Sequence, residues 1–235
     1  MIEINHLAFG YPKSNTLFRN LNLSLLQGGV CGLLGKNGSG KTTLLKLIAG
    51  LLFPTDGSCQ VHQQESKLRY PSMLQEICFL PEDLYVPALT PESYVKFYAP
   101  FYPLFEKDFL HGCMKEFELP QNKLLTRFSY GQKKKFLISF GLATHCRLFI
   151  LDEPTNGLDI PSKAIFRKLL ASAITDEKLF IISTHQVHDV ERLIDSVVIL
   201  DDGRIIFNQH LDNQDTYIDI ETLFNKVMGS KTVKL

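Results

Sequence analysis

The sequence carries no excess of charge of either sign and no long apolar run. Lysine and arginine together number 25, as do aspartate and glutamate, so the formal net charge is zero. Because binding to nucleic-acid phosphates usually requires a basic excess, we expect no nucleic-acid partner. No apolar run approaches the ~20 residues that a membrane helix needs, and the start of the sequence lacks the pattern of a secretory signal. We therefore expect a cytoplasmic protein, whose role at a membrane would require a partner.

Cysteines are few, scattered and odd in number, and no two of them form a C-x-x-C pair. This pattern excludes a disulfide framework and a cysteine-based zinc site, and it predicts reduced, mostly buried thiols. Hydrophobic residues make up 45% of the chain and charged residues 21%, which is typical of a globular protein with an ordinary core. The cysteines are Cys31, Cys59, Cys78, Cys113 and Cys146.

What the sequence does contain is a glycine-rich loop at residues 35–42, which fits the phosphate-binding pattern G-x-x-x-x-G-K-[ST]. A polyphosphate needs several backbone N–H groups turned inward at once, and glycines permit the backbone angles that this requires. Lys41 can reach the β- and γ-phosphates, and the Thr42 hydroxyl can bind Mg²⁺. The context agrees, because residues 29–34 predict a buried strand and residues 43–52 a helix whose N-terminus faces the anion.

A pair of carboxylates follows another apolar run. Residues 148–151 predict a strand that leads into Asp152 and Glu153, and the carboxyl end of such a strand lies beside the ligand in open α/β sheets. Asp152 would hold Mg²⁺ directly or through water, and Glu153 would polarise a water near the γ-phosphate. Alone, such a pair is more often a helix cap or loop. Here the pair is followed directly by the polar segment 154–159, and residues 183–185 follow the next expected strand. These two segments favour the catalytic interpretation.

One block of the chain departs from the alternation of strands and helices. Aromatic residues between positions 94 and 109 recur at helical spacing, which Pro100 and Pro103 must interrupt. We predict one α/β domain, with a core of residues 1–84 and 146–235 and an inserted all-helical lobe of residues 85–145. The aromatic stripe is a candidate partner-binding face, although burial in the lobe core is the commoner outcome.

Individual elements are predicted from periodicity and turn residues. Strands within residues 2–28, on either side of a turn at 11–15, form an N-terminal antiparallel β subdomain. Residues 58–76 predict short strands and a polar linker. Further strands are expected at 77–80, 179–182, 197–200 and 205–207, and further helices at 109–117, 136–143, 161–173, 186–194 and 217–228.

Together these segments resemble the ATP-binding subunit of an ABC transporter over nearly the whole chain. Tyr11 stands where this family stacks an aromatic ring on adenine. Five stretches carry the resemblance in the family's order: residues 35–42 (Walker A), 128–132 (the signature LSGGQ), 148–153 (Walker B with its catalytic glutamate), 157–159 (the D-loop) and His185 (the switch histidine).

The resemblance implies a P-loop NTPase core of the RecA-like type that binds and hydrolyses ATP with Mg²⁺. It also implies a head-to-tail dimer with a second ATP-binding subunit, a homodimer being expected, that drives an integral-membrane permease at the inner face of the cell membrane. Glu153 and His185 would be catalytic, and Asp159 would belong to the D-loop. The nucleotide-binding residues would be Tyr11, Gly35, Lys36, Asn37, Gly38, Ser39, Gly40, Lys41, Thr42 and Thr43.

The signature has a physical basis of its own. Ser129 and Gly131 precede a helix expected to start near Gln132, so a hydroxyl and backbone N–H groups meet the positive end of a helix dipole. The resemblance implies that Ser129, Gly131 and Gln132 contact the ATP held by the partner chain. The lysines at residues 133–135 would either add to the attraction for phosphate or lie solvated on the outer helix face.

Two residues depart from the family's pattern. Tyr130 replaces the usual small third residue of the signature, a position we expect to be tolerant because its neighbours are kept. Glu82 stands where most members have the glutamine of the Q-loop. Because a carboxylate also ligates Mg²⁺, the expected metal ligands are Thr42, Asp152 and Glu82.

The permease contact is expected where the core meets the lobe. Leu84, Tyr85 and Val86 form an apolar run in an expected loop, where such a run is costly unless it is covered. The resemblance implies that residues 82–87 and 91–98 line a groove for a short cytoplasmic helix of the permease. The alternative is that the three apolar side chains fold back onto the lobe core.

Two other functions compete with the transporter subunit. A soluble ABC-type ATPase would act on ribosomes, chromosomes or cofactor assembly, but the single cassette and the short interval from Lys41 to Ser129 disfavour the first two. The cofactor-assembly role stays open. A nucleotide-binding switch without turnover is disfavoured by the presence of Glu153 and His185. The transported substrate, its direction and the identity of the permease are left open.

Overall fold

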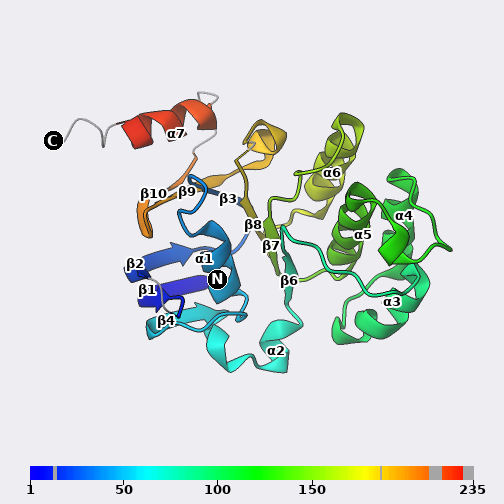
Figure 1. Cartoon of the computed structure of the whole chain (residues 1–235), viewed down its shortest axis with the longest axis horizontal. Helices are drawn as coiled ribbons and strands as arrows, with labels where there is room; N and C mark the ends of the chain where they lie inside the picture. Colours follow the sequence, from blue (N-terminus) through cyan, green and yellow to red (C-terminus); the bar gives the residue numbers. More distant parts are fainter. Residues whose placement is uncertain (13–14, 186, 212–218, 230–235) are drawn as a thin grey trace.

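Two β-sheets organise the fold (Figure 1). The smaller sheet is antiparallel, with the order β2-β1-β4-β5, and contains β1 (Ile2–Gly10), β2 (Thr16–Leu25), β4 (Asp56–Val61) and β5 (Gln64–Glu65). The larger has the order β10-β9-β3-β8-β7-β6, and contains β3 (Val30–Leu34), β6 (Ile77–Leu80), β7 (Leu148–Asp152), β8 (Leu179–Ser183), β9 (Ser196–Asp201) and β10 (Arg204–His210). The computed structural model describes residues 1–12, 15–185, 187–211 and 219–229.

The larger sheet places the ends of three strands at one edge. Strands β9, β3, β8, β7 and β6 are parallel, and only β10 runs antiparallel to its neighbour. Strands β3, β7 and β8 are buried along their whole length, as expected for parallel strands covered on both faces. Because β8 lies between β3 and β7, the carboxyl ends of all three meet at one edge, where open α/β sheets bind their ligands.

Helices cover both faces of this sheet. Helix α1 packs between the two sheets, and its leucines share a core cluster with β1 and β2. Helices α3, α4 and α5 gather at the opposite end from the smaller sheet (Figure 1), and their core is continuous with the other face of the larger sheet. The helices are α1 (Lys41–Ile48), α2 (Pro71–Leu74), α3 (Pro91–Tyr98), α4 (Lys107–Glu116), α5 (Tyr130–Ala143), α6 (Ile160–Ala173) and α7 (Ile220–Gly229).

In the helical lobe, some aromatic residues pack in the core and others are exposed. Residues 85–145, all of which the structure describes, contain helices and no strand. The Tyr94 ring meets Phe136 and Phe140 edge to face, with ring centroids 5.2 and 5.0 Å apart. Phe97 and Phe101 are instead exposed. The interruption expected at Pro100 is present, because α3 gives way to a 3₁₀ turn at Ala99–Phe101.

The segment after β8 corrects one prediction. Residues 187–194 form two 3₁₀ turns, Val187–Asp189 and Glu191–Leu193, instead of a helix, and Gln186 lies outside the described residues. The chain must return to β9, whose approach is fixed by the bond from the Asp195 N–H to the Val30 carbonyl, 2.9 Å. A 3₁₀ turn covers more length per residue than an α-helix, so it spans this distance with few residues.

Several boundaries also differ from the prediction. Helix α1 ends at Ile48 because Gly50 adopts a left-handed φ of 67° and closes the last turn. Residues 71–74 form the short helix α2 within the expected linker. Residues 13–14 of the expected turn and 217–218 of the expected last helix lie outside the described residues; α7 begins at Ile220.

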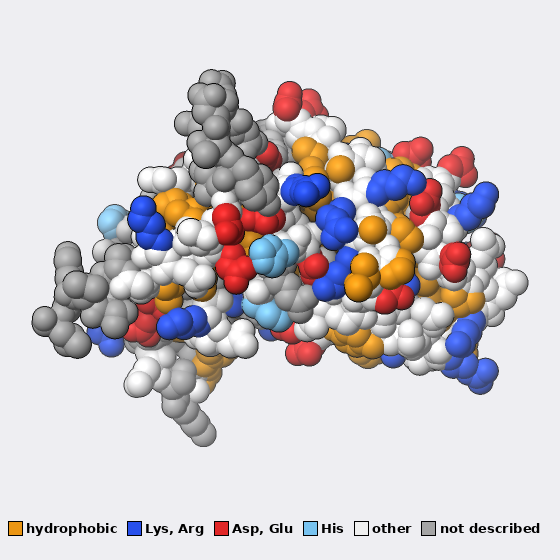
Figure 2. Space-filling model, turned by 90° about the horizontal axis from the view of Figure 1, so that it is seen from above, with side chains coloured by type: hydrophobic (Ala, Val, Ile, Leu, Met, Phe, Trp, Pro, Cys, Tyr) orange, Lys and Arg blue, Asp and Glu red, His pale blue; other side chains and the backbone are white. Residues whose placement is uncertain are grey.

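Other broad expectations agree with the structure. The five cysteines are free and buried, and burial raises the pKa of the Cys31 and Cys146 thiols to about 12. On the face in Figure 2, lysine and arginine side chains are mixed with acidic and apolar ones. Within the described part of the chain, no helix is long and apolar enough to cross a membrane.

Candidate nucleotide-binding site

The glycine-rich loop connects β3 to α1 at the edge where the parallel strands end. Gly38 and Gly40 have φ angles of 82° and 109°, a left-handed conformation that side chains other than glycine rarely adopt. Gly35 is needed for a different reason, because a Cβ there would overlap the Leu200 carbonyl at the end of β9. Glycines therefore let the loop turn tightly against the end of the sheet.

Lys41 lies buried in the first turn of α1 and folds back across the loop. Its ammonium group donates to the carbonyls of Gly35, at 2.8 Å, and Lys36, at 3.2 Å. Burial lowers the pKa of Lys41, while the carboxylates of Glu153 and Asp152 oppose that shift. The arrangement holds a cation in the middle of the loop, where a point charge suits a phosphate.

Asp152 ends β7 and accepts two hydrogen bonds from hydroxyl groups. The Thr42 hydroxyl donates to one carboxylate oxygen at 2.7 Å, and the Ser183 hydroxyl donates to the other. Thr42 lies in the first turn of α1 and Ser183 ends β8, so three elements converge on one carboxylate. Oxygen ligands of this kind suit Mg²⁺. Sequence reasoning missed Ser183, which its place at the end of β8 could have indicated.

Glu153 is held from its backbone and from its side chain. Its N–H donates to the Ser183 carbonyl at 3.0 Å, and its φ is 48°, in the left-handed region. One carboxylate oxygen lies 2.9 Å from Nδ1 of His185, and the other accepts from the His185 N–H at 3.4 Å. The predicted base and the predicted switch histidine are therefore direct partners.

These groups line one cavity of about 530 Å³. The Tyr11 hydroxyl hydrogen-bonds the Thr43 hydroxyl at 3.1 Å, and the residue is 42% exposed; its stacking on adenine stays a prediction. Ser39 is buried within the loop, and Gly35 and Lys36 line a separate recess under α7. The predicted residues lining the cavity are Tyr11, Asn37, Gly38, Gly40, Lys41, Thr42, Thr43, Glu82, Asp152, Glu153 and His185.

The signature residues lie apart from this cavity, at the N-terminus of α5. Ser129 caps the helix: its hydroxyl accepts from the Gln132 N–H at 3.2 Å, and its N–H donates to the Gln132 side chain at 3.1 Å. Helix α5 therefore starts at Tyr130, two residues before the predicted start. None of Ser129, Gly131 or Gln132 lines the cavity of their own chain.

The two unusual residues of the sequence are in contact. The Tyr130 hydroxyl donates to the Glu82 carbonyl at 3.0 Å, and burial raises the pKa of Tyr130. The Glu82 carboxylate lines the cavity and accepts from the Asn156 side chain at 3.2 Å. Asn156 was not predicted as a site residue. Tyr130 thus joins the lobe to the loop that carries Glu82.

Asp159 begins α6 as its N-cap. Its carboxylate accepts from the Ser162 N–H at 3.0 Å, and the bonds to Ser162 hold the pKa of Asp159 below its usual range. Lys135 lies 3.9 Å away. A helix cap accounts for these contacts, and the D-loop role stays a prediction.

Sequence reasoning also missed Lys134. Instead of lying solvated on the outer face of its helix, Lys134 is fully buried, and its ammonium group donates to the Glu153 carbonyl at 2.7 Å. Burial lowers the pKa of Lys134, and Glu82, Glu153 and Asp152 oppose the shift. Nothing in three consecutive lysines marks the middle one, because the helix start fixes which of them points inward.

Comparisons with known proteins agree with this geometry. A family model described as ABC transporter matches residues 18–156. The chain is 28% identical over 228 residues to the ABC transporter ATP-binding protein YtrB of Bacillus subtilis, covering 96% of this chain and 77% of the relative. It is 31% identical over 194 residues to the bacitracin transport ATP-binding protein BcrA of Bacillus licheniformis, covering 80% of this chain and 62% of the relative.

Solved structures show the same fold. The structure of an ATP-binding subunit of an ABC transporter superposes with a TM-score of 0.84 at 25% identity, covering 98% of this chain and 99% of that one. The fold and the loop define an ATPase of the P-loop class. The chain belongs to the ABC transporter family. It is the subunit of such a transporter that binds and hydrolyses ATP.

Proposed function

We propose that two copies of this chain pair head to tail, hold two Mg-ATP at their interface and drive an integral-membrane permease. The observation that supports the dimer is that two elements suited to phosphate, the loop at residues 35–42 and the N-terminus of α5, lie apart in one chain. The cavity is lined by Lys41 and by the carboxylate residues. The signature lies at a helix N-terminus that lines no part of that cavity. A helix N-terminus attracts anions, so this end of α5 suits the ATP of a second chain.

Mg²⁺ fits the donor set of the cavity. Thr42 supplies a hydroxyl, and Asp152 and Glu82 supply carboxylates, all of which line the same cavity. The ion would neutralise phosphate charge when bound. Glu153 would accept a proton from the attacking water, and His185 would hold the Glu153 carboxylate in position.

Pairing that depends on ATP tests the dimer. We expect the isolated chain to run as a monomer without nucleotide, and Glu153→Gln to run as a dimer with ATP on a sizing column. Adding Ser129→Arg should abolish that dimer, because the larger side chain would block the phosphate. Lys115→Arg, on an exposed part of α4, is the matched control. Dimers that respond neither to ATP nor to Ser129→Arg would contradict the proposal.

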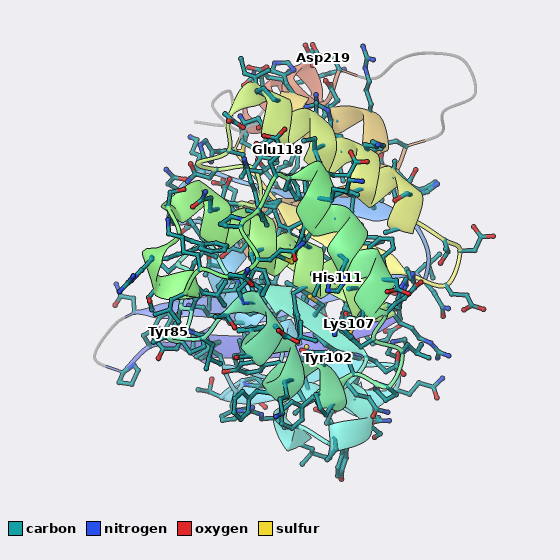
Figure 3. The ribbon with its side chains drawn as sticks, turned by 90° about the vertical axis from the view of Figure 1, so that its right-hand side faces the viewer. Tyr85, Tyr102, Lys107, His111, Glu118 and Asp219 are labelled. Carbon is teal, nitrogen blue, oxygen red and sulfur yellow. The ribbon has the colours of Figure 1, made fainter. Side chains whose placement is uncertain are left out.

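The permease contact is proposed at the junction of core and lobe. Val86 is buried, and Leu84 is partly buried against the lobe core, as expected if these two side chains fold back onto that core. Tyr85 is 84% exposed and stands at the margin of the molecule in Figure 3. An exposed tyrosine of this kind suits an interface, since its ring buries a large area when covered.

Membrane fractionation of cells that carry the native partner tests this contact. Tyr85→Asp should release the chain from the membrane fraction and leave its ATP hydrolysis intact. Leu26→Asp, at an equally exposed apolar residue after β2, should leave both unchanged. If the unmodified chain never sediments with membranes, or binds a ribosome or assembly scaffold instead, the soluble ATPase of cofactor assembly replaces the permease-driving subunit as the proposed function.

A further inference from the structure

We propose that Lys134 is a positioning residue for ATP hydrolysis: its buried ammonium group holds the backbone carbonyl of Glu153 and so directs the Glu153 carboxylate. The proposal rests on the role proposed above for Glu153, the group that activates water. It assigns to the signature helix a second task, toward the ATP of its own chain.

The burial of Lys134 needs an explanation. Lysine is among the residues least often fully buried, because desolvating its charge is costly. Lys134 has 0% exposure, although its neighbours Lys133 and Lys135 on the same helix reach solvent. Its ammonium group ends 2.7 Å from the Glu153 carbonyl. A methionine would fill the same space without a charge, so the packing alone does not require a lysine.

The backbone conformation of Glu153 has to be stabilised by its neighbours. Its left-handed φ of 48° is a conformation that a residue other than glycine keeps only when its surroundings enforce it. The Ser183 carbonyl fixes its N–H on one side, and Lys134 fixes its carbonyl on the other. With both ends fixed, the side chain leaves the backbone in a defined direction, toward His185 at 2.9 Å.

Tyr130 lies against the Lys134 side chain. It lies one helical turn before Lys134, whose ammonium group is 5.3 Å from the centre of the Tyr130 ring. The ring also lies over Gly157, where an added Cβ would come within 2.6 Å of it. Because Tyr130 also bonds the Glu82 carbonyl, a movement of α5 would reach the backbone of both carboxylate-bearing loops.

The test compares Lys134→Met with the unmodified chain in single-turnover hydrolysis of ATP. We expect the rate to fall roughly tenfold to a hundredfold, the range known for small misplacements of a catalytic group. ATP affinity and the midpoint of thermal unfolding should stay close to those of the unmodified chain. Lys134→Gln keeps an N–H donor and should recover part of the rate. Lys115→Met, an exposed lysine of the same lobe, should hydrolyse normally.

A double-mutant cycle with Glu153→Gln separates positioning from general loss of structure. If Lys134 acts only through the Glu153 carboxylate, Lys134→Met should cause no further loss in the Glu153→Gln background. An equal loss in both backgrounds, or normal hydrolysis by Lys134→Met, would overturn the proposal. Normal hydrolysis by Glu153→Gln alone would instead overturn the role of Glu153, so the two failures are distinguishable.

Discussion

The phosphate loop and the signature are both glycine-containing segments at a helix N-terminus, and they differ in what surrounds them. Residues 35–42 include a buried lysine, Lys41, and share a cavity with the carboxylates of Glu82, Asp152 and Glu153. In the signature, Ser129 caps its own helix, and the nearest buried lysine, Lys134, donates its hydrogen bond to the Glu153 carbonyl. The first element supplies a cation for phosphate and lies beside the carboxylates that a metal requires. The second offers only N–H groups and a hydroxyl, so it suits a phosphate that another chain already holds.

This contrast predicts its largest effect at Glu153. Glu153→Gln keeps the shape of the side chain but cannot accept a proton, so we expect hydrolysis to fall by roughly 10² to 10⁴-fold, the usual range for a general base. Nucleotide affinity should be kept, because Lys41 and the loop are unchanged. Phosphate release and equilibrium nucleotide binding, measured on one preparation, check both statements. Undiminished phosphate release would remove Glu153 from the mechanism.

The next largest effect is expected at Lys41. Lys41→Ala removes the cation that lies among the loop carbonyls. Hydrogen bonds to charged groups contribute about 1.5–3 kcal/mol, so ATP affinity should fall by at least tenfold. Titration with a fluorescent ATP analogue measures it. Lys36→Ala is the matched control, because Lys36 lies in the same loop but outside the cavity wall, and it should lose much less affinity.

Residues close in sequence and fixed by backbone chemistry were predicted well from the sequence. The loop at 35–42, the strand ending at Asp152 and the position of His185 follow from glycine spacing and from apolar runs that end in polar residues. Lys134 could not be placed, because its direction depends on the exact start of α5 and on packing against the distant residue Glu153. The turns at residues 187–193 were missed because the distance back to β9 overrides a helical pattern.

A smaller effect is expected at Ser129, and it should be of a different kind. Ser129→Ala removes the N-cap of α5 and should lower the free energy of unfolding by about 1 kcal/mol. Because Ser129 does not line the cavity, the ATP affinity of the monomer should not change. ATP-dependent pairing should weaken, since a hydroxyl is lost. Urea unfolding, nucleotide titration and a sizing column report the three quantities separately. A fall in monomer ATP affinity would mean that the two elements are not independent.

The smallest effect is expected at Glu82, which lies where the two regions meet. Its carboxylate lines the cavity, and its carbonyl is bound by Tyr130 of the signature. Glu82→Gln keeps an oxygen ligand and leaves the carbonyl in place, so hydrolysis should stay nearly normal at saturating Mg²⁺. Glu82→Ala removes the ligand and should raise the Mg²⁺ concentration needed for half-maximal hydrolysis, which a Mg²⁺ titration at fixed ATP measures. A large loss with glutamine would show that the negative charge itself is required. Equal Mg²⁺ requirements in all three proteins would instead take Glu82 out of the metal site and leave it as the link between core and signature.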